Sequence, residues 1–336
     1  MILTTPLLER LAARGPVHVV ATPANAGILA NHPAVESVIV FDKRDRDRGV
    51  GGIRRIAHAA RRVGATSAYL AQGSLRTAAI AWMAGIPERV GFSTSPGRVL
   101  YTQRVPFDAS LHHAQRLWQL GTPRGTVETA PSLRPTVHPG AADVASVDAL
   151  MTSCGVAASD QLIALAPGSV WATKRWPSFD ALAAVLVARF GPDSSFAPMR
   201  IVVVGAMSDR PLAAAIAESV ALRGGAPVID ATGRLSLLGS AALLARARLL
   251  VTNDSAPLHL ASAMNTPTIA LFGPTVPAFG FGPLADVRRT VERQGLACRP
   301  CGAHGPQQCP LVHWHCMREL SEDGVADLVQ VVVGVG

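Results

Sequence analysis

The sequence predicts a two-domain α/β protein in which each domain contains a parallel, doubly wound sheet. Three observations lead to this prediction. The 336 residues are too many for one ordinary core and suit two domains of about 150 residues each. Short β-branched runs alternate with amphipathic helical stretches, as in βαβ units. A stretch rich in Pro, Gly and Thr from about residue 121 to 143 predicts a linker, so we place the domains at 1–145 and 146–336.

The first series of elements begins with a helix, because Pro6 occupies a first-turn position and apolar residues follow on one face. Buried strands are expected at 17–20, 37–41 and 67–70. A helix between the last two places its apolar residues on one face: Ile53, Ile56, Ala57, Ala60 and Val63. Doubly wound domains usually open with a strand, so we expect the first strand of this domain to be missing from residues 1–336.

The second series has the same rhythm. A helix is expected over 179–190, since Pro177 and Ser178 form a start signal. Strands are expected at 162–166, 201–205, 228–230, 249–252 and 268–273.

Composition and charge narrow the function. Hydrophobic residues make up 49% and charged residues 16%, which indicates a globular chain. No apolar run approaches the ~20 residues of a membrane-spanning helix. The N-terminus lacks a basic region followed by an apolar core, so we expect no signal peptide and a cytoplasmic location.

The net charge of +8 favours anionic partners, either phosphorylated ligands or an acidic membrane surface. Nucleic acid is disfavoured, because aromatic residues make up 5% and the basic residues are scattered. A basic surface that serves only solubility is the alternative.

Residues 166–177 form the first loop with ligand-binding chemistry, between a strand and a helix. Gly168 permits a close backbone turn, and Ser169 and Thr173 supply hydroxyl groups. Lys174 and Arg175 supply charge-assisted hydrogen bonds to phosphate oxygens. Two adjacent cations at the carboxyl end of a strand favour anion binding over an ordinary polar loop.

Residues 252–263 form the second such loop. A buried strand leads into Asp254 and Ser255 and then into a helix, whose first N–H groups, at Ser255 and Ala256, can hold a pyrophosphate. His259 lies one turn later and can face the same cleft. In the simpler alternative, Asp254 only caps the helix and His259 only packs.

Three further positions lie at the same carboxyl edge. Gly205 and Gly273 follow two other strands, where ligands bind in open α/β sheets. Leu235 follows the short strand at 228–230, and we expect it to pack against a base.

Three patterns together resemble glycosyltransferase family 9, the ADP-heptose–lipopolysaccharide heptosyltransferases. They are Pro-Gly-Ser-x4-Lys-Arg-Trp-Pro from Pro167, Thr-Asn-Asp-Ser-x3-His-x-Ala-x-Ala from Thr252, and Leu-Phe-Gly-Pro-Thr from Leu271. The resemblance extends over nearly the whole chain. It implies the GT-B fold, two Rossmann-like domains facing a central cleft, and an enzyme that inverts the anomeric centre without a metal.

The resemblance also implies roles for individual residues. Ser169 and Lys174 match positions that hold the donor diphosphate, and Asp254, Ser255 and His259 match the family's Asp-Ser/Thr-Gly-x-x-His donor site. Ala256 stands where the family usually has Gly, so its methyl group narrows the approach of the pyrophosphate. On the acceptor side, Ser74 and Arg76 lie in a segment similar to one in the family, with Arg76 a candidate for an acceptor phosphate or carboxylate.

The general base is the main departure from the family pattern. That pattern runs from a strand through Gly-Asp to Thr-x-Pro or Thr-Thr-Pro, and its Asp removes the acceptor hydroxyl proton. Residues 1–6 match only the part after Gly-Asp. We therefore expect the first strand and the base to be encoded upstream of Met1, and we assign no catalytic residue within the chain.

A cysteine cluster lies near the end, in the segment 298–316. Cys298 and Cys301 form a Cys-x2-Cys knuckle, and Cys309 and Cys316 follow at wider spacing. The cluster predicts either a structural zinc site or free thiols, and disulfides are disfavoured in a reducing cytoplasm. No cofactor is expected for catalysis.

These features predict an inverting transfer of heptose from ADP-heptose to a lipopolysaccharide core. The expected partners are an ADP-sugar donor, a phosphorylated lipid-linked saccharide acceptor and, by peripheral contact, the inner membrane surface. Two alternatives stay open: a related transferase using another nucleotide sugar, and a catalytically silent nucleotide-sugar binding protein. A nicotinamide-dependent dehydrogenase is disfavoured, because no Gly-x-Gly-x-x-Gly opens either half.

Overall fold

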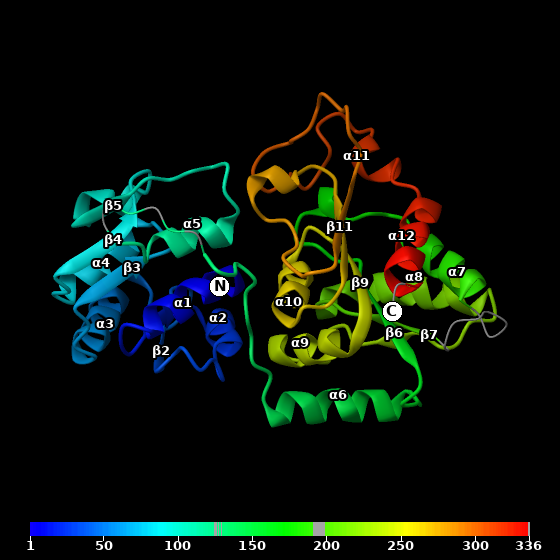
Figure 1. Cartoon of the computed structure of the whole chain (residues 1–336), viewed down its shortest axis with the longest axis horizontal. Helices are drawn as coiled ribbons and strands as arrows, with labels where there is room; N and C mark the ends of the chain where they lie inside the picture. The colour runs from blue at the N-terminus through cyan, green and yellow to red at the C-terminus, as the bar shows by residue number, and fades with distance from the viewer. Residues whose placement is uncertain (124–125, 127, 129, 191–198, 335–336) are drawn as a thin grey trace. The chain divides into compact units, whose positions relative to one another are not determined.

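The computed structural model describes residues 1–123, 126, 128, 130–190 and 199–334. The chain divides into two compact units, unit 1 (Met1–His138) and unit 2 (Pro139–Gly336) (Figure 1). The boundary predicted at residue 145 falls inside helix α6 (Ala141–Ser153). This helix packs against α9 (Leu237–Arg246), and that contact assigns α6 to unit 2.

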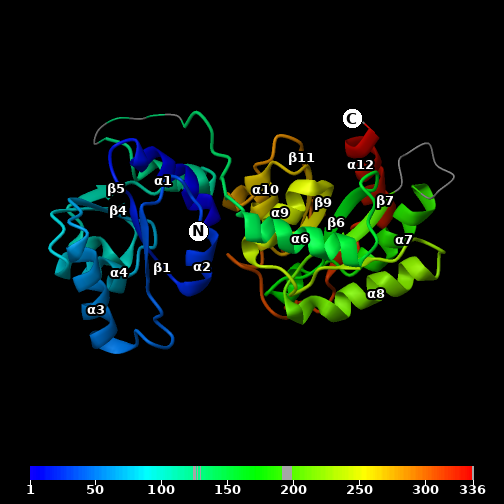
Figure 2. The same ribbon diagram turned by 90° about the horizontal axis from the view of Figure 1, so that it is seen from below.

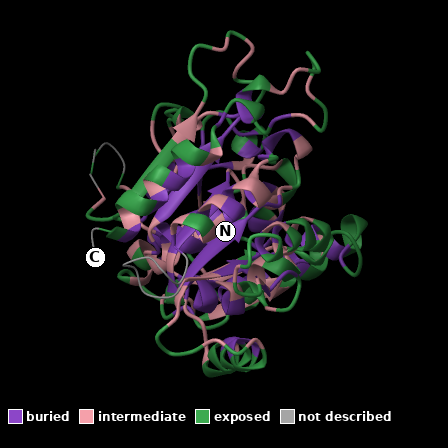
Figure 3. Ribbon diagram, turned by 90° about the vertical axis from the view of Figure 1, so that its right-hand side faces the viewer, coloured by how far each residue is buried: buried purple, intermediate pink, exposed green. Residues whose placement is uncertain are grey.

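Unit 2 is built on one continuous sheet of six parallel strands. The strand order is β11-β10-β9-β6-β7-β8. In sequence order the strands are β6 (Gln161–Ala166), β7 (Met199–Val203), β8 (Ile229–Asp230), β9 (Ala247–Asn253), β10 (Thr268–Phe272) and β11 (Arg288–Glu292). Leu165 pairs with Val203 on one side and with Val251 on the other, and all three are fully buried. Strands buried on both faces are typical of parallel sheets (Figure 3).

Helices cover both faces of this sheet. Helix α7 (Phe179–Arg189) packs against α8 (Arg210–Ala221) and α12 (Glu322–Gly334) on one face, and α9 packs against α10 (Ala256–Met264) on the other (Figures 1 and 2). The shorter helices of unit 2 are η3 (Ala172–Lys174), η4 (Met207–Asp209), η5 (Pro277–Phe279) and α11 (His315–Arg318).

Unit 1 distributes its five strands over two separate parallel sheets. The first pairs β1 (His18–Ala21) with β2 (Ser37–Val40), and the second has the order β3 (Ser67–Leu70), β4 (Glu88–Phe92), β5 (Gln103–Val105). Within the described part of unit 1, no strand joins the two sheets. Along the sequence, strands and helices alternate in unit 1 as they do in a doubly wound domain. The strands nevertheless form two separate sheets.

The helices of unit 1 form two packed pairs. Helix α3 (Gly49–Arg62) packs against α4 (Leu75–Met83) through Ile56 and Ile80, with Phe41 in the same cluster. Helix α1 (Thr5–Ala12) packs against α5 (His113–Gln119). The remaining elements are η1 (Ile2–Thr4), α2 (Pro23–Ile28) and η2 (Pro96–Leu100).

The structure confirms the predicted strands and helices to within two residues at their ends. It confirms the opening helix as α1, preceded by the single turn η1. Strands β4, β5 and β11 were not predicted, because each is short and polar or charged at its start. In the described residues, no helix combines the length and apolar character needed to cross a membrane.

Candidate functional site

The candidate site lies at the carboxyl edge of the unit 2 sheet, where all five strands that carry predicted ligand loops end. From β6 the chain first adds β7 and β8 on one side and then β9, β10 and β11 on the other. The order therefore reverses between β6 and β9. Ligands in open α/β sheets bind outside the carboxyl ends of the strands at such a reversal point. The loops after β6 and β9 are the two that sequence reasoning singled out.

A buried ion pair connects these two loops. The Lys174 Nζ donates to Asp254 Oδ2 at 2.6 Å, and both side chains are only about one-tenth exposed. The Thr275 hydroxyl, from the loop after β10, donates to the same oxygen at 2.7 Å. One carboxylate oxygen thus holds a cation and a hydroxyl from two other loops. The pair places the Lys174 ammonium, held by a carboxylate, at the reversal point of the sheet.

The buried Asn253 side chain fixes the loop after β6 in this position. Its Oδ1 accepts from the Trp176 backbone N–H at 3.1 Å, and its Nδ2 donates to the Pro167 carbonyl at 2.8 Å. Both ends of the loop that carries Lys174 are therefore bonded to the last residue of β9. The Trp176 indole N–H also donates to the Leu320 carbonyl at 3.2 Å.

Helix α10 begins immediately after Asp254 and directs its first turn at the same edge. Ser255 is its N-cap and the exposed Ala256 its first residue. Pro257 has no N–H and the Leu258 N–H donates to the Ser255 carbonyl, so the N–H groups of Ser255 and Ala256 are the ones available to a ligand. The helix dipole favours an anion beside them. The Ser255 Oγ is buried, and among the described residues it has no hydrogen-bond partner. Buried hydroxyls normally have one, so this oxygen is suited to a ligand. His259 lies half-buried one turn later, 6.4 Å from the Phe281 ring.

The polar residues of the loop after β6 differ in exposure and in their hydrogen bonds. Arg175 is exposed, and its Nε donates to the Ser169 carbonyl at 2.8 Å. The half-buried Ser169 Oγ accepts from the Trp171 N–H at 3.3 Å. Thr173, predicted to contact the donor, is buried, and its hydroxyl donates to the Pro306 carbonyl. Its side chain therefore holds the loop through a long-range acceptor that sequence reasoning could not locate, and its contact with the donor stays a prediction.

Gly168 and Gly205 share a neighbour that explains both glycines. The buried Asp209 carboxylate accepts from the Ala206 N–H at 2.8 Å and lies against both positions. A Cβ at Gly205 would lie 2.7 Å from Asp209 Oδ2, and one at Gly168 would overlap the same carboxylate. Gly273 has a different constraint, because a Cβ there would lie 2.7 Å from the Met317 side chain. The three glycines serve close packing at the carboxyl edge.

Three predicted contact residues lie on exposed or half-exposed surfaces. Leu235 is half-buried beside Gly239. In unit 1, Ser74 caps α4 by accepting from the Thr77 N–H at 3.2 Å, and Arg76 is exposed on the same helix. The base contact of Leu235 and the acceptor contacts of Ser74 and Arg76 stay predictions.

Residues of the Cys-rich segment hold the ligand loops in place through hydrogen bonds. Sequence reasoning did not predict these contacts. The Gln307 side chain accepts from the Ala172 N–H and donates to the Val170 carbonyl, both at 3.0 Å. Arg299 donates to the Gly273 carbonyl and, at 2.9 Å, to the Thr275 carbonyl. Gln307 lies more than 100 positions from the loop after β6, and Arg299 belongs to no motif. No local sequence pattern therefore identified either residue.

The cysteines of this segment are free thiols in the structure. Burial raises the pKa of Cys316 to about 11, and burial likewise raises the pKa of Cys301. The Cys298 Sγ lies 3.9 Å from His313 Nε2. Across the part of the chain that the structure describes, no group of three or more His, Cys, Asp or Glu side chains is arranged to hold a metal ion. A structural zinc site in this segment stays a prediction, and elemental analysis of protein purified without added zinc tests it.

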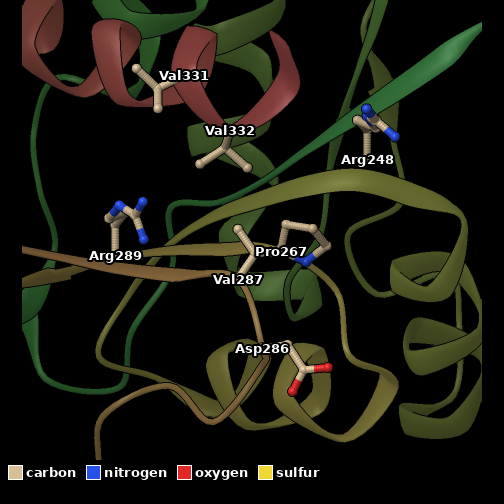
Figure 4. Close-up of a pocket in the computed structure, with 7 residues that line it drawn as sticks. All are labelled: Arg248, Pro267, Asp286, Val287, Arg289, Val331 and Val332. Atoms are coloured by element: carbon tan, nitrogen blue, oxygen red, sulfur yellow. The ribbon is translucent and has the colours of Figure 1, made fainter. Parts of the chain in front are cut away.

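A cavity of about 380 Å³ lies at the opposite, amino-terminal end of the strands (Figure 4). Arg248, Pro267 and Val287 lie at or just before the starts of β9, β10 and β11, and Val331 and Val332 come from α12. None of the predicted site residues lines it. The candidate site is defined instead by the converging loops.

Comparison with known proteins decides the family. The sequence pattern of glycosyltransferase family 9 (heptosyltransferase) matches residues 53–313, which include all the ligand loops. The chain belongs to glycosyltransferase family 9. This family 9 member is accordingly a glycosyltransferase, as the sequence predicted. It is similar to lipopolysaccharide heptosyltransferase 2 of Escherichia coli, with 26% identity over 308 residues covering 87% of this chain and 84% of the relative.

Solved structures agree on the fold of this family 9 member. An Escherichia coli ADP-heptose lipopolysaccharide heptosyltransferase II matches with a TM-score of 0.79 and 22% identity, covering 100% of this chain and 95% of that one. An Escherichia coli heptosyltransferase with ADP matches with a TM-score of 0.66 and 21% identity, covering 98% and 95%. The GT-B fold predicted from the sequence is confirmed.

Proposed function

We propose that this enzyme transfers heptose from ADP-heptose to a growing lipopolysaccharide core, with inversion at the anomeric carbon and without a metal ion. The observation that carries the proposal is the Lys174–Asp254–Thr275 group at the reversal point of the sheet, beside the first turn of α10. The two similar structures, an ADP-heptose heptosyltransferase and a heptosyltransferase with ADP, support the donor. The lipopolysaccharide heptosyltransferase relative supports the acceptor class.

In this proposal the site stabilises the ADP leaving group. As the bond between the anomeric carbon and the outer phosphate oxygen breaks, the acceptor oxygen bonds to that carbon and its hydroxyl proton passes to a general base. Negative charge then develops on the outer phosphate. The Lys174 ammonium, the exposed Arg175 and the N–H groups at the start of α10 lie where they can meet that charge. Cationic side chains thus stabilise the negative charge of the leaving group, as a metal ion does in other transferases.

Asp254 has a positioning role in this proposal. Its carboxylate holds the Lys174 ammonium and the Thr275 hydroxyl at 2.6 and 2.7 Å, so the cation is oriented before the donor binds. The unpaired Ser255 hydroxyl then supplies a further donor to a phosphate oxygen. Such preorganisation avoids a reorganisation cost during the reaction.

The acceptor in this proposal is a phosphorylated, lipid-linked saccharide at the cytoplasmic side of the inner membrane. Arg76 would contact an acidic group of the acceptor. The formal charge of +8 supports an anionic acceptor and a peripheral contact with an acidic bilayer.

A donor screen tests the proposal. Purified enzyme is incubated with a deacylated core acceptor and with ADP-heptose or UDP-sugars, in buffer with and without a chelator. We expect turnover with ADP-heptose alone, unchanged by chelation, and a product of inverted configuration by NMR. Turnover with UDP-sugars only would assign another donor. ADP binding without turnover of any donor would indicate a nucleotide-sugar binding protein.

A further inference from the structure

The outward face of helix α4 in unit 1 exposes large apolar side chains. Leu75 is 52% exposed and Trp82 is 58% exposed. They are seven residues apart, which places them on the same side of the helix two turns from each other. Ala78 and Ala81, between them in the sequence, are buried in the unit 1 core. Leu75 and Trp82 are therefore two large apolar side chains that the packing of this helix leaves exposed.

The single turn η2 extends this apolar surface beside α4. The Gly97 N–H donates to the Gly73 carbonyl at 3.0 Å, and a Cβ on Gly97 would lie 2.9 Å from the Ala78 side chain. This close approach fixes η2 against the start of α4. Val99, two residues later in η2, is 68% exposed. Scattered single apolar residues are normal on surfaces, but several on two packed elements indicate an interaction site.

Exposed arginines lie beside Val99. Arg98 precedes it in η2, and Arg104 Nε donates to the Arg98 carbonyl at 3.2 Å, which brings β5 to η2. Residues 48–87 contain six arginines and no Asp or Glu. Between residues 70 and 106 the one acidic residue is Glu88, whose carboxylate accepts from the Ser67 hydroxyl. The stretch that carries α4, η2 and β5 is thus predominantly positive, with four arginines against one glutamate.

We propose that this surface, the α4–η2 face, docks onto an anionic lipid bilayer. Its members are Leu75, Trp82, Arg98, Val99 and Arg104. Exposed tryptophan and aliphatic side chains enter the boundary between headgroups and acyl chains, and arginines bind lipid phosphates. Charge complementarity selects the bilayer over a second copy of this chain, because two copies would bring like charges together. The inference deepens the proposed function, on which it rests for the delivery of a lipid-linked acceptor.

Vesicle sedimentation with the full chain tests this proposal. Vesicles of phosphatidylethanolamine with phosphatidylglycerol are compared with vesicles of phosphatidylcholine. We expect binding to the anionic vesicles that weakens as salt rises, and about tenfold weaker binding to the neutral ones. The double variant Trp82→Ser/Val99→Ser should bind anionic vesicles about tenfold more weakly, and Arg98→Ser should show a shallower salt dependence.

Leu222→Ser is the matched control, because Leu222 is 80% exposed in unit 2. It should bind vesicles like the parent chain, and circular dichroism should show that all variants are folded. Equal vesicle binding by the double variant and the parent would overturn the proposal, as would absence of binding by the parent. Self-association that the double variant abolishes would assign the face to a second copy.

The same variants separate this proposal from the proposed function. On a water-soluble deacylated acceptor, the Trp82→Ser/Val99→Ser variant should transfer sugar at the parent rate. If neither protein transfers heptose but only the parent binds anionic vesicles, the docking face stands and the proposed function fails. If both transfer heptose and both bind vesicles equally, the proposed function stands and the docking face fails.

Discussion

The two units build parallel sheets in contrasting ways. In unit 2 six strands form one sheet, and all five residues of β10 are buried. In unit 1 five strands are divided between two sheets, and none of the four residues of β2 is fully buried. The loops that gather Lys174, Asp254 and Thr275 thus extend from the more deeply buried sheet. A site that needs side chains placed to fractions of an ångström is built where the supporting strands have the least freedom.

The largest expected effect contrasts a buried strand residue of unit 2 with an exposed strand residue of unit 1. Phe272→Ala, in β10, should lower the free energy of unfolding by about 3–5 kcal/mol, because it leaves a cavity at a fully buried site. Val20→Ala, in β1, should cost under about 1 kcal/mol, since Val20 is 37% exposed. Urea unfolding combined with amide hydrogen exchange measures both. Equal losses would show that the difference in burial does not translate into stability.

The second prediction concerns catalysis at the edge of the unit 2 sheet. Lys174→Met should lower kcat/KM for glycosyl transfer by about 10²–10³-fold, because the leaving diphosphate loses its buried cation. It should also destabilise unit 2, since Asp254 is left buried beside an apolar side chain. Steady-state kinetics and calorimetric titration with ADP measure these effects.

Arg175→Met is the control for Lys174→Met. Arg175 is exposed, so its loss should cost about tenfold or less in kcat/KM. If Arg175→Met proved as damaging as Lys174→Met, the buried pair would not be the centre of the site.

The third prediction addresses the acid sensitivity of unit 1. Burial, with the positive charge of Arg116, lowers the pKa of His113 to about 4 from its ordinary 6.5. Between these values the unfolded chain binds a proton that the folded chain does not. Stability is therefore complete above pH 6.5 and declines as pH falls toward 4, by about 1–2 kcal/mol at pH 5.

His113→Gln should remove this pH dependence from unit 1. Hydrogen exchange at pH 5 and pH 7.5, resolved by peptide, measures the stability of each unit separately. A pH response in unit 1 that survived the substitution would assign it to other groups.

The smallest expected effect is on the segment that braces the ligand loops. Gln307→Ala removes two hydrogen bonds to the loop after β6, so we expect a loss of about 1 kcal/mol in donor binding, a rise in KM of roughly fivefold. Gln294→Ala, at an exposed position of unit 2, is the control and should leave KM unchanged. An unchanged KM in both variants would show that the brace does not act on the donor site.

Sequence reasoning recovered most of unit 2 because its strands are apolar runs bounded by turns. It located β6, β9 and β10 and placed both Lys174 and Asp254 at their carboxyl ends. It missed β11, an edge strand that starts with two arginines, because an exposed edge strand carries no run of buried residues. The pattern of burial, rather than β-propensity, decided which strands were recognisable.

The pairing within the site was beyond local patterns. Lys174 and Asp254 are 80 residues apart, and their contact follows from the strand order, which periodicity does not specify. The hydrogen bond from Thr173 was likewise not predictable, because its acceptor, the Pro306 carbonyl, lies 133 positions away. Motifs identified the ligand loops, and the tertiary contacts show which partner each side chain of a loop binds.

The Asp209 carboxylate has a consequence for how this site can evolve. It occupies the space that a side chain would need at both Gly168 and Gly205, and it also binds the Ala206 N–H. A side chain at either glycine therefore requires the Asp209 carboxylate to move, and that movement releases the Ala206 N–H that it holds. The three positions are thus coupled, and we expect a substitution at either glycine to be tolerated better in a chain that already has a shorter residue at position 209.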